Sequence, residues 1–344
     1  MTLAIAQAIK QGTSGPRTSG LPDRGNDDTP IPMIVVTGGA GFIGSNIVRA
    51  LNRAGEARIV VVDNLENVDK HRNLNRCKFI DLIDKRDFLH RLPNLTEVTA
   101  VLHQGACSAT TERNGRYLLE NNIDWSKHLL AWAMARNVPF IYASSASVYG
   151  DGSDGFREDE GCEYPLNGYA FSKWVFDEHV RRIAPHARSQ IVGLRYFNVY
   201  GPQENHKGSM ASVLYHFYHQ LAEHGEIRLF AGSDGFRRDF IHVDDCVAMN
   251  LHFLARPQVS GIYNCGTGVA RSFAELAAAF CVERPGTRVA TIPFPHALKG
   301  KYQAYTCADL SRLRASGYTA PFIQLEEGVR RYLAQLDTTG GWYK

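Results

Sequence analysis

Short apolar runs alternate with amphipathic stretches from Met33 onward. A continuous apolar run of about 4 to 8 residues predicts a strand that is buried on both faces. Such runs cover residues 33–37, 58–63, 100–106, 139–145 and 190–201. Helical spacing of apolar residues separates them, most plainly at 42–54 and 117–136. Strands separated by helices are typical of a parallel sheet covered on both sides, so we expect an α/β fold with a doubly wound sheet.

A glycine-rich turn follows the first apolar run. The stretch "TGGAGFIG" places Gly38, Gly41 and Gly44 between a strand and a helix, and Asp63 ends the second strand. Glycines there permit a tight turn, a close approach to a pyrophosphate and close packing of helix on strand, and the acid can accept from a ribose hydroxyl. We therefore expect a Rossmann-type sheet that binds a dinucleotide. Asp63 favours NAD, whereas a cation from Lys70 or His71 would allow the 2′-phosphate of NADP.

The regularity loosens after Tyr200, where a helix near 210–224 and a short strand at 227–230 follow. We expect a smaller, partly interleaved C-terminal lobe, with ligands in the crevice between the lobes. The predicted division is a flexible leader at 1–32, a dinucleotide-binding domain at 33–200 to which part of 239–266 returns, and a substrate-binding lobe at 201–238 and 267–344.

Composition narrows the class of protein. Hydrophobic residues make up 44% of the 344 residues, charged residues 21%, and the net charge is +3, which is ordinary globular usage and points to neither nucleic acid nor a membrane surface. The 7 cysteines show no C-x-x-C pair and no metal spacing with histidine, so we expect reduced thiols and no metal site. No apolar run approaches the roughly 18 residues of a membrane span, and the N-terminus lacks a signal-peptide pattern. These features predict a cytoplasmic protein.

Candidate chemistry lies in "YAFSK", where Tyr169 and Lys173 stand one helical turn apart on the same face. A phenol has a pKa near 10, and a neighbouring ammonium would stabilise its anion, so the tyrosine could take a proton from an alcohol. The strand-end stretch "SSASVYG" offers Ser144, Ser145 and Ser147 as hydroxyls that could hold a substrate oxygen. Tyr and Lys at this spacing are common, but their place after a phosphate loop and a serine-bearing strand end favours a catalytic function.

These motifs resemble the extended short-chain dehydrogenase/reductases, also called the NAD-dependent epimerase/dehydratase family. The resemblance runs from Met33 nearly to the C-terminus. It is carried by "VTGGAGFIGSNIV", "VVDNL", "QGACSATTE", "YASSASVYG", "RYFNVYGP", "HKGSMASV", "RRDF" and "KGKYQA". The first motif marks the superfamily alone, whereas "QGACS", "HKGSMAS" and "KGKYQA" are specific to one branch.

The resemblance also implies which residues contact the ligands. Besides the three glycines, cofactor contacts would come from Phe42, Ile43, Asp63, Asn64, Lys70, Lys85, Gln104, Gly105, Ala106, Cys107, Ser108, Asn121, Lys173, Val199 and Lys207. Substrate contacts would come from Asn198, Ser209, His216, Phe230, Ala231, Gly232, Ser233, Arg238 and Tyr302. Two features depart from the family pattern, namely the leader and Gln104, which stands where the family often has an acid.

The activity implied by that branch is epimerisation at C6 of the heptose of ADP-D-glycero-D-manno-heptose, through a 6-keto sugar, in the supply of the lipopolysaccharide inner core. Inversion through a ketone needs two acid/base groups, and Tyr169 and Lys207 are the hypothesis. An exposed lysine has a pKa near 10.4, so Lys207 must be partly desolvated or lie near a cation such as Arg238 or His206. The branch uses tightly bound NADP, with NAD also usable, and forms pentamers.

Other reactions remain open from the residues alone. A 4,6-dehydratase would carry an Asp-Glu pair after the strand-end hydroxyl, where this chain has Ala146 and Ser147, so dehydration is disfavoured. The alternatives are an NAD(P)-dependent epimerase or reductase of another nucleotide sugar, or a non-catalytic dinucleotide-binding protein. The last would be expected to lose Tyr169 or Lys173, and both are present.

Overall fold

A seven-stranded parallel sheet forms the centre of the molecule, in the order β10-β6-β5-β4-β1-β2-β3. The structure, a computed structural model, describes residues 32–294 and 303–343. The strands are β1 (Met33–Thr37), β2 (Ile59–Asp63), β3 (Asp81–Asp84), β4 (Val98–His103), β5 (Phe140–Ser145), β6 (Ile191–Tyr196) and β10 (Gly261–Cys265). This strand order is that of a doubly wound dinucleotide-binding sheet, and it confirms the predicted fold class.

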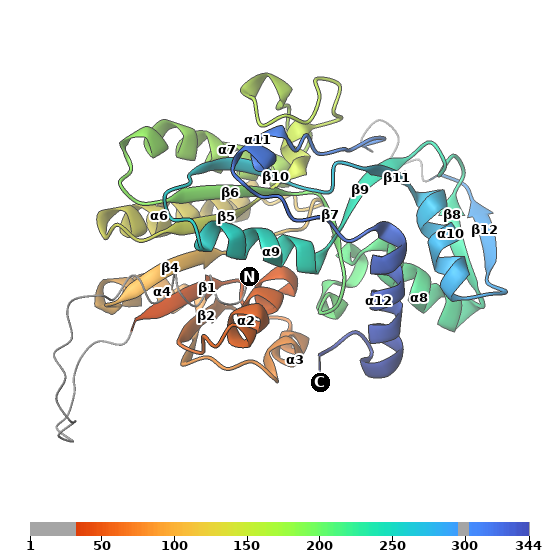
Figure 1. Cartoon of the computed structure of the whole chain (residues 1–344), viewed down its shortest axis with the longest axis horizontal. Coiled ribbons are helices and arrows are strands. Elements are labelled where there is room, and N and C mark those ends of the chain that lie inside the picture. The colour runs from red at the N-terminus through yellow and green to blue at the C-terminus, as the bar shows by residue number, and fades with distance from the viewer. Residues whose placement is uncertain (1–31, 295–302, 344) are drawn as a thin grey trace.

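Helices cover both faces of this sheet (Figure 1). One face carries α2 (Phe42–Arg53), α3 (His71–Leu74), α9 (Val243–Leu254) and α11 (Ser311–Ala315), and the other carries α4 (Lys85–Arg91), α6 (Trp125–Ala135) and α7 (Gly168–Ile183). Successive residues of β1 serve the two cores alternately, since Ile34 and Val36 pack on the first face and Val35 on the second. The apolar runs are continuous because both faces are buried.

Two expected elements are divided in the structure. The predicted helix at 117–136 consists of α5 (Gly115–Leu118), a π-helical stretch (Leu119–Asp124) and α6. The predicted strand at 190–201 splits at Phe197 into β6 and β7 (Asn198–Tyr200), which joins another sheet. The edge strand β3 was not predicted, because Asp81 and Asp84 make its sequence look polar.

In its described residues the second lobe contains two small sheets and three helices, and β8, β12 and α10 lie to the right of the large sheet in Figure 1. Its elements are β7, α8 (Val213–His224), β8 (Glu226–Phe230), β9 (Arg237–His242), β11 (Ala270–Ser272), α10 (Phe273–Glu283), β12 (Arg288–Ile292) and α12 (Leu325–Thr339). Between them, α9 and β10 return to the large sheet. Leu313 in α11 also packs on that sheet, within a range that the sequence assigned to the second lobe. The predicted domain boundaries stay a prediction.

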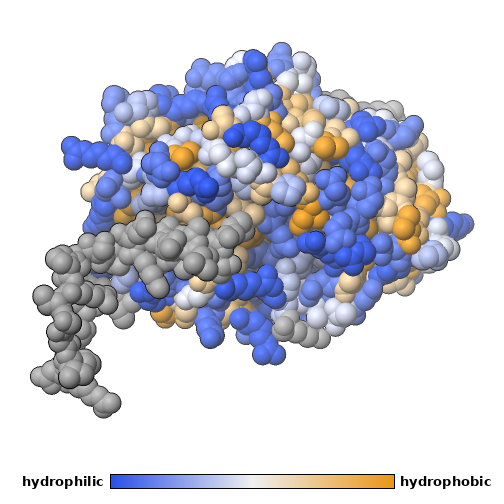
Figure 2. Space-filling view, viewed as in Figure 1, coloured by the Kyte–Doolittle hydropathy of each residue, from blue (hydrophilic) through white to orange (hydrophobic). Residues whose placement is uncertain are grey.

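The surface shows hydrophilic residues over most of the viewed face, with apolar residues in small groups (Figure 2). Across residues 32–294 and 303–343, none of the helices is both long and apolar enough to span a membrane. The predicted leader falls almost wholly outside the described residues.

Candidate active site

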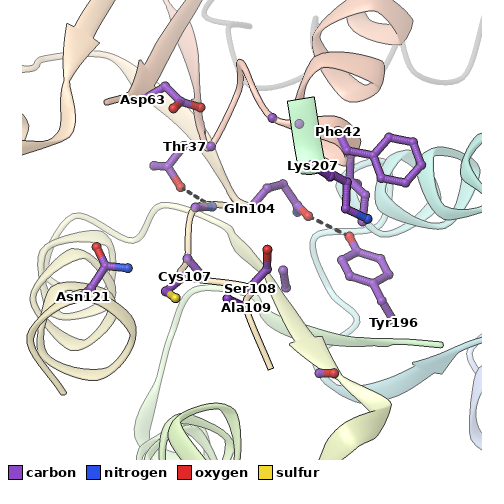
Figure 3. Close-up of a pocket in the computed structure, with 18 of the residues that line it drawn as sticks. Thr37, Phe42, Asp63, Gln104, Cys107, Ser108, Ala109, Asn121, Tyr196 and Lys207 are labelled. Carbon is purple, nitrogen blue, oxygen red and sulfur yellow. Dashed lines mark hydrogen bonds between the residues drawn. The ribbon is translucent and has the colours of Figure 1, made fainter. Parts of the chain in front are cut away.

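A cavity of about 580 Å³ opens at the carboxyl ends of β1, β4, β5 and β6. The residues Ser145, Tyr169, Lys173 and Lys207 line it, as does every cofactor contact implied by the resemblance, whereas Ser147 and His71 do not. The predicted residues that line it are Gly38, Gly41, Phe42, Ile43, Gly44, Asp63, Asn64, Lys70, Lys85, Gln104, Gly105, Ala106, Cys107, Ser108, Asn121, Ser145, Tyr169, Lys173, Val199 and Lys207. Asp63 and Asn121 lie on one side, and Phe42, Lys207 and Tyr196 on the other (Figure 3). The cavity therefore brings together groups from both lobes.

The glycine-rich turn lets neighbouring main-chain segments pack closely against it. Gly38 has φ +64°, and a Cβ there would lie 2.6 Å from the nitrogen of Gly105. A Cβ on Gly44 would lie 2.1 Å from the carbonyl oxygen of Gly38. Gly41 is the N-cap of α2, so the free N–H groups of that helix face the cavity. A helix N-terminus behind a tight glycine turn fits a dinucleotide pyrophosphate.

Asp63 lies at the end of β2 with both carboxylate oxygens engaged. One oxygen accepts from the main-chain N–H of Ala40 at 3.0 Å, and the other accepts from Asn64 N at 2.8 Å. Lys70 donates to the second oxygen at 3.0 Å and also to the side-chain oxygen of Asn64 at 3.2 Å. The corner where a ribose 2′ substituent would lie thus holds both an acid and a cation.

A buried hydrogen-bond chain, missed at the sequence level, supports the turn from below. The Thr37 hydroxyl accepts from Gly105 N at 3.2 Å, and the Ser126 hydroxyl donates to Asn122 O at 2.6 Å. His103 lies between the two hydroxyls, with Nδ1 2.6 Å from Thr37 Oγ1 and Nε2 2.9 Å from Ser126 Oγ. We therefore assign Thr37 as donor to Nδ1 and Nε2–H as donor to Ser126, which is the neutral imidazole. Burial lowers the pKa of His103 to about 3.

Gln104 belongs to a closed ring of three hydrogen bonds. Its amide nitrogen donates to Asn250 Oδ1 at 3.2 Å, Asn250 donates to the Tyr196 hydroxyl at 2.8 Å, and that hydroxyl donates to Gln104 Oε1 at 2.9 Å. The last bond is drawn in Figure 3. A carboxylate at position 104 would place a second acceptor against Asn250 Oδ1, so the ring explains how this chain accommodates glutamine.

Asn121 and Asn122 order the wall near Cys107. Lys85 donates to Asn121 Oδ1 at 2.6 Å, and Asn121 in turn donates to Asn122 Oδ1 at 3.0 Å. The same Asn122 oxygen accepts from Cys107 N at 2.8 Å, and the Asn122 amide donates to Cys107 O at 3.0 Å. These bonds fix the loop after β4, which forms one wall of the cavity.

Tyr169 and Lys173 lie on α7 beside the end of β5. The Tyr169 phenol hydrogen-bonds to Ser145, whose hydroxyl already accepts from Ser147 Oγ at 2.9 Å and so has its own proton to donate. Burial raises the pKa of Tyr169, and the Ser145 bond opposes that rise. Lys173 donates to Ala143 O at 2.8 Å, and burial lowers its pKa to about 8. In this geometry Ser145 is a neighbour that favours the Tyr169 anion, and the role expected of Lys173 stays a prediction.

Ser144 has a structural role. Its hydroxyl donates to Asp177 Oδ2 at 2.8 Å, and Asp177 also accepts from Tyr142 at 2.8 Å and from Arg195 Nε at 2.9 Å. The side chains of Arg195 and Asp177 are fully buried. Arg195 also pairs with Glu163 at 2.5 Å. This buried network fixes β5, β6 and α7 relative to one another beneath the catalytic side chains.

Lys207 reaches the cavity from the loop that follows β7. Its Nζ lies 5.0 Å from the centre of the Phe42 ring and 3.9 Å from Glu204 Oε2, and its side chain is 23% exposed. Burial lowers the pKa of Lys207, and the Glu204 carboxylate opposes that fall. The desolvation that the chemistry requires is present. Of the two cations suggested as neighbours, His206 lines the cavity and Arg238 does not.

The predicted substrate residues that the structure describes are absent from the lining of this cavity. Asn198 is exposed on β7, His216 lies on α8, and Arg238 is buried on β9, where its guanidinium is 5.6 Å from the Phe273 ring centre. Ser209 and residues 230–233 are likewise absent from its lining. Tyr302 lies outside the described residues. These assignments stay predictions.

Sequence reasoning also missed a set of lining residues from several strands and loops. They are Thr37, Val62, Ala109, Thr110, Tyr117, Trp125, Ala143, Tyr196, Phe197 and Met210. Tyr196 and Phe197 could have been found, because they end a buried strand on the same edge of the sheet as Ser145. The others depend on how distant segments pack.

Comparison with known proteins shows the family of this chain. Residues 34–266 match the profile of the NAD dependent epimerase/dehydratase family. The chain belongs to that family. A nicotinamide dinucleotide is the cofactor of the family, and the glycine turn, the α2 N-terminus and Asp63 fit it.

Similar proteins within the family include two curated relatives named ADP-L-glycero-D-manno-heptose-6-epimerase. That of Brachyspira hyodysenteriae is 52% identical over 90% of this chain and 99% of its own. That of Alkalilimnicola ehrlichii is 53% identical over 88% of this chain and 96% of its own. The solved structure of the Helicobacter pylori ADP-L-glycero-D-manno-heptose-6-epimerase is 30% identical, with a TM-score of 0.79 over 91% of this chain and 98% of that one. A structure of Thermus thermophilus UDP-glucose 4-epimerase in complex with NAD is 28% identical, with a TM-score of 0.74 over 89% and 99% of the two chains.

Proposed function

We propose that the protein inverts C6 of the heptose in ADP-D-glycero-D-manno-heptose and so produces ADP-L-glycero-D-manno-heptose for the lipopolysaccharide inner core. The observation that carries this proposal is the likeness to relatives named for that activity, 52% and 53% identical over 90% and 88% of the chain. The cavity supports it, because Tyr169, Lys173 and Lys207 line the same space.

Inversion through a 6-keto sugar needs a proton acceptor and a proton donor on the substrate oxygen. A nicotinamide dinucleotide, when bound, supplies the hydride chemistry at C6. Tyr169 takes the C6 hydroxyl proton in one substrate orientation, and Lys207 gives a proton to the ketone oxygen in the other. Ser145 holds the oxygen near Tyr169, and Lys173 supplies positive charge one turn along α7. The two protein groups exchange roles when the reaction runs in reverse.

We propose NADP as the preferred cofactor, with NAD also usable. Lys70 can donate to a 2′-phosphate, and its present contact with Asp63 already offsets the charge that would repel it. We expect Lys70→Ala to weaken NADP binding about tenfold or more and to leave NAD binding nearly unchanged. Titration of the purified protein with each dinucleotide measures both affinities. Equal weakening of the two would argue against a phosphate contact.

The catalytic assignment is tested with ADP-D-glycero-D-manno-heptose and separation of the two epimers. Lys207→Met and Tyr169→Phe should each slow turnover about a hundredfold or more, with the dinucleotide still bound. Lys78→Met, at an exposed lysine outside the cavity lining, is the matched control and should keep full activity. Full turnover by Lys207→Met would refute the two-base mechanism.

The substrate assignment is tested with a panel of nucleotide sugars. Rapid epimerisation of the ADP-heptose without net change in nicotinamide absorbance supports the proposal. Turnover of a UDP- or dTDP-sugar instead would favour the alternative enzymes, and bound dinucleotide with no turnover would favour the non-catalytic alternative.

The oligomeric state and the cellular location of the protein are also proposals. The family resemblance implies a pentamer, and the composition implies a cytoplasmic enzyme with no nucleic-acid or membrane partner. Sedimentation of the purified chain would measure the first, and cell fractionation the second.

A further inference from the structure

The loop that carries Lys207 is fixed on the side away from the cavity. Gln203 donates to the main-chain oxygen of Asn73 at 2.9 Å, and Asn205 donates to the main-chain oxygen of Gly340 at 2.7 Å. One contact ties the loop to the large sheet's helices and the other ties it to the chain after α12. Lys207 therefore leaves a fixed backbone, and its side chain is the part that can move.

Glu204 lies inside this loop, and its side chain has no exposed surface. Its two carboxylate oxygens each accept from Ser212, one from the main-chain N–H at 2.6 Å and one from the hydroxyl at 2.6 Å. Burial and the nearby Glu204 charge raise the pKa of the Tyr332 phenol in α12. The cation that faces this carboxylate is Lys207, whose Nζ lies 3.9 Å from Glu204 Oε2. A fully buried carboxylate is costly unless it faces a cation, and Lys207 is that cation.

Titratable and aromatic groups from several elements surround the pair. On the side of Glu204 these are the phenols of Tyr215 in α8 and Tyr332 in α12. On the side of Lys207 they are the ring of Phe42 in α2 and the imidazole of His206, which Lys70 also faces. Burial lowers the pKa of His206 to about 4, so this imidazole is neutral near neutral pH. Glu204 thus supplies the negative charge that stands against the ammonium.

We propose that Glu204 is a positioning residue that holds the Lys207 ammonium at the cavity wall and keeps it charged until it gives its proton to the substrate oxygen. This inference rests on the proposed function, in which Lys207 is one of the two acid/base groups. Without a counter-ion, burial would lower the pKa of Lys207 further, so that more of the amine would be neutral and able only to accept a proton. With Glu204 at 3.9 Å it can hold, give and regain a proton.

The test compares Glu204→Gln with Ser212→Ala across pH. The first variant removes the charge, whereas the second removes one hydrogen bond to Glu204 and the N-cap of α8 but keeps the charge. Loss of an opposite charge at this distance should move the alkaline limb of the kcat profile to lower pH by about one unit or more. Ser212→Ala should lower activity at every pH without moving the limb. Equal limbs in all three proteins would overturn the proposal.

A second measurement does not depend on turnover. Competitive acetylation with acetic anhydride, read by mass spectrometry on the peptide that contains Lys207, gives the pH at which this amine becomes nucleophilic. That midpoint should fall by the same amount in Glu204→Gln and stay in place in Ser212→Ala. An unchanged midpoint in Glu204→Gln refutes the role of Glu204 even when Lys207→Met shows that the lysine is catalytic. If Lys207→Met keeps turnover, the two-base mechanism fails, while the midpoint still decides the role of Glu204.

Glu204→Met covers the case in which Glu204→Gln does not fold. It removes the same charge but places no amide donor against the N–H of Ser212, and replacing a buried ion by an apolar side chain is often tolerated. The same fall in the labelling midpoint is expected, and a midpoint equal to that of the unmodified chain overturns the proposal.

Discussion

His103 makes the stability of the nucleotide-binding sheet depend on pH. The ring is 3% exposed, it holds the Thr37 and Ser126 hydroxyls, and it stacks on Trp125 with ring centres 5.4 Å apart. Burial lowers the pKa of His103 to about 3, whereas a histidine in an unfolded chain has a pKa near 6.5. As pH falls from 6.5 towards 3, the unfolded chain takes up a proton that the folded chain does not.

The direction and the size of the effect on stability follow from this difference in the pKa of His103. The contribution of the neutral His103 ring to stability is fully present above about pH 6.5, falls as the pH is lowered, and levels off near pH 3. Each pH unit in that window costs about 1.4 kcal/mol, so His103 lowers the free energy of unfolding by about 2 kcal/mol between pH 6.5 and pH 5. The protonated ring could no longer accept from Thr37, and this loss would loosen the support of the glycine-rich turn.

The assay is urea unfolding at pH 7.5 and pH 5.0 for the natural chain and for His103→Gln. Glutamine does not titrate, and the contributions of all other groups, including His206, cancel in the comparison. We expect the natural chain to lose about 2 kcal/mol more than the variant between the two pH values. Equal losses in the two proteins would show that the neutral, buried imidazole is not the cause.

Two further predictions concern the turn and the network beneath the site. Gly38→Ala should abolish dinucleotide binding, because its Cβ would lie 2.6 Å from Gly105 N; a titration that shows normal affinity would contradict this close contact. Asp177→Asn should lower the free energy of unfolding by about 3–5 kcal/mol. The fully buried Arg195 would lose the carboxylate that accepts from its Nε at 2.9 Å. Urea unfolding measures this loss, and a change below 1 kcal/mol would mean that Glu163 alone satisfies Arg195.

Local patterns carried much of the prediction. The turn at Gly38 to Gly44 and the pair Tyr169 and Lys173 were found because each lies within one strand-turn-helix or one helix turn. The long helix at 117–136 was only partly right, because the π-helical stretch follows from tertiary contacts that periodicity does not report.

Contacts between distant segments were not accessible to the same reasoning. The Gln104 ring joins the loop after β4 to β6 and α9, and the imidazole of His103 bridges β1 and α6. Glu204 looked like an ordinary loop acid, since nothing in "GPQENHKGSM" shows that its side chain is enclosed. Its importance comes from α8 and α12, which close over it.

The sequence by itself determined the alternation of central strands and helices, the dinucleotide turn and the residue types available for proton transfer, because each depends on local spacing. Only the tertiary structure decided which of those groups are charged. Burial and opposing charge set the protonation of His103, Lys173 and Lys207, and both arise when segments far apart in the chain pack together. The lysine of "HKGSM" could be named from the sequence, but its counter-ion and its neutral histidine neighbour appear only in the fold.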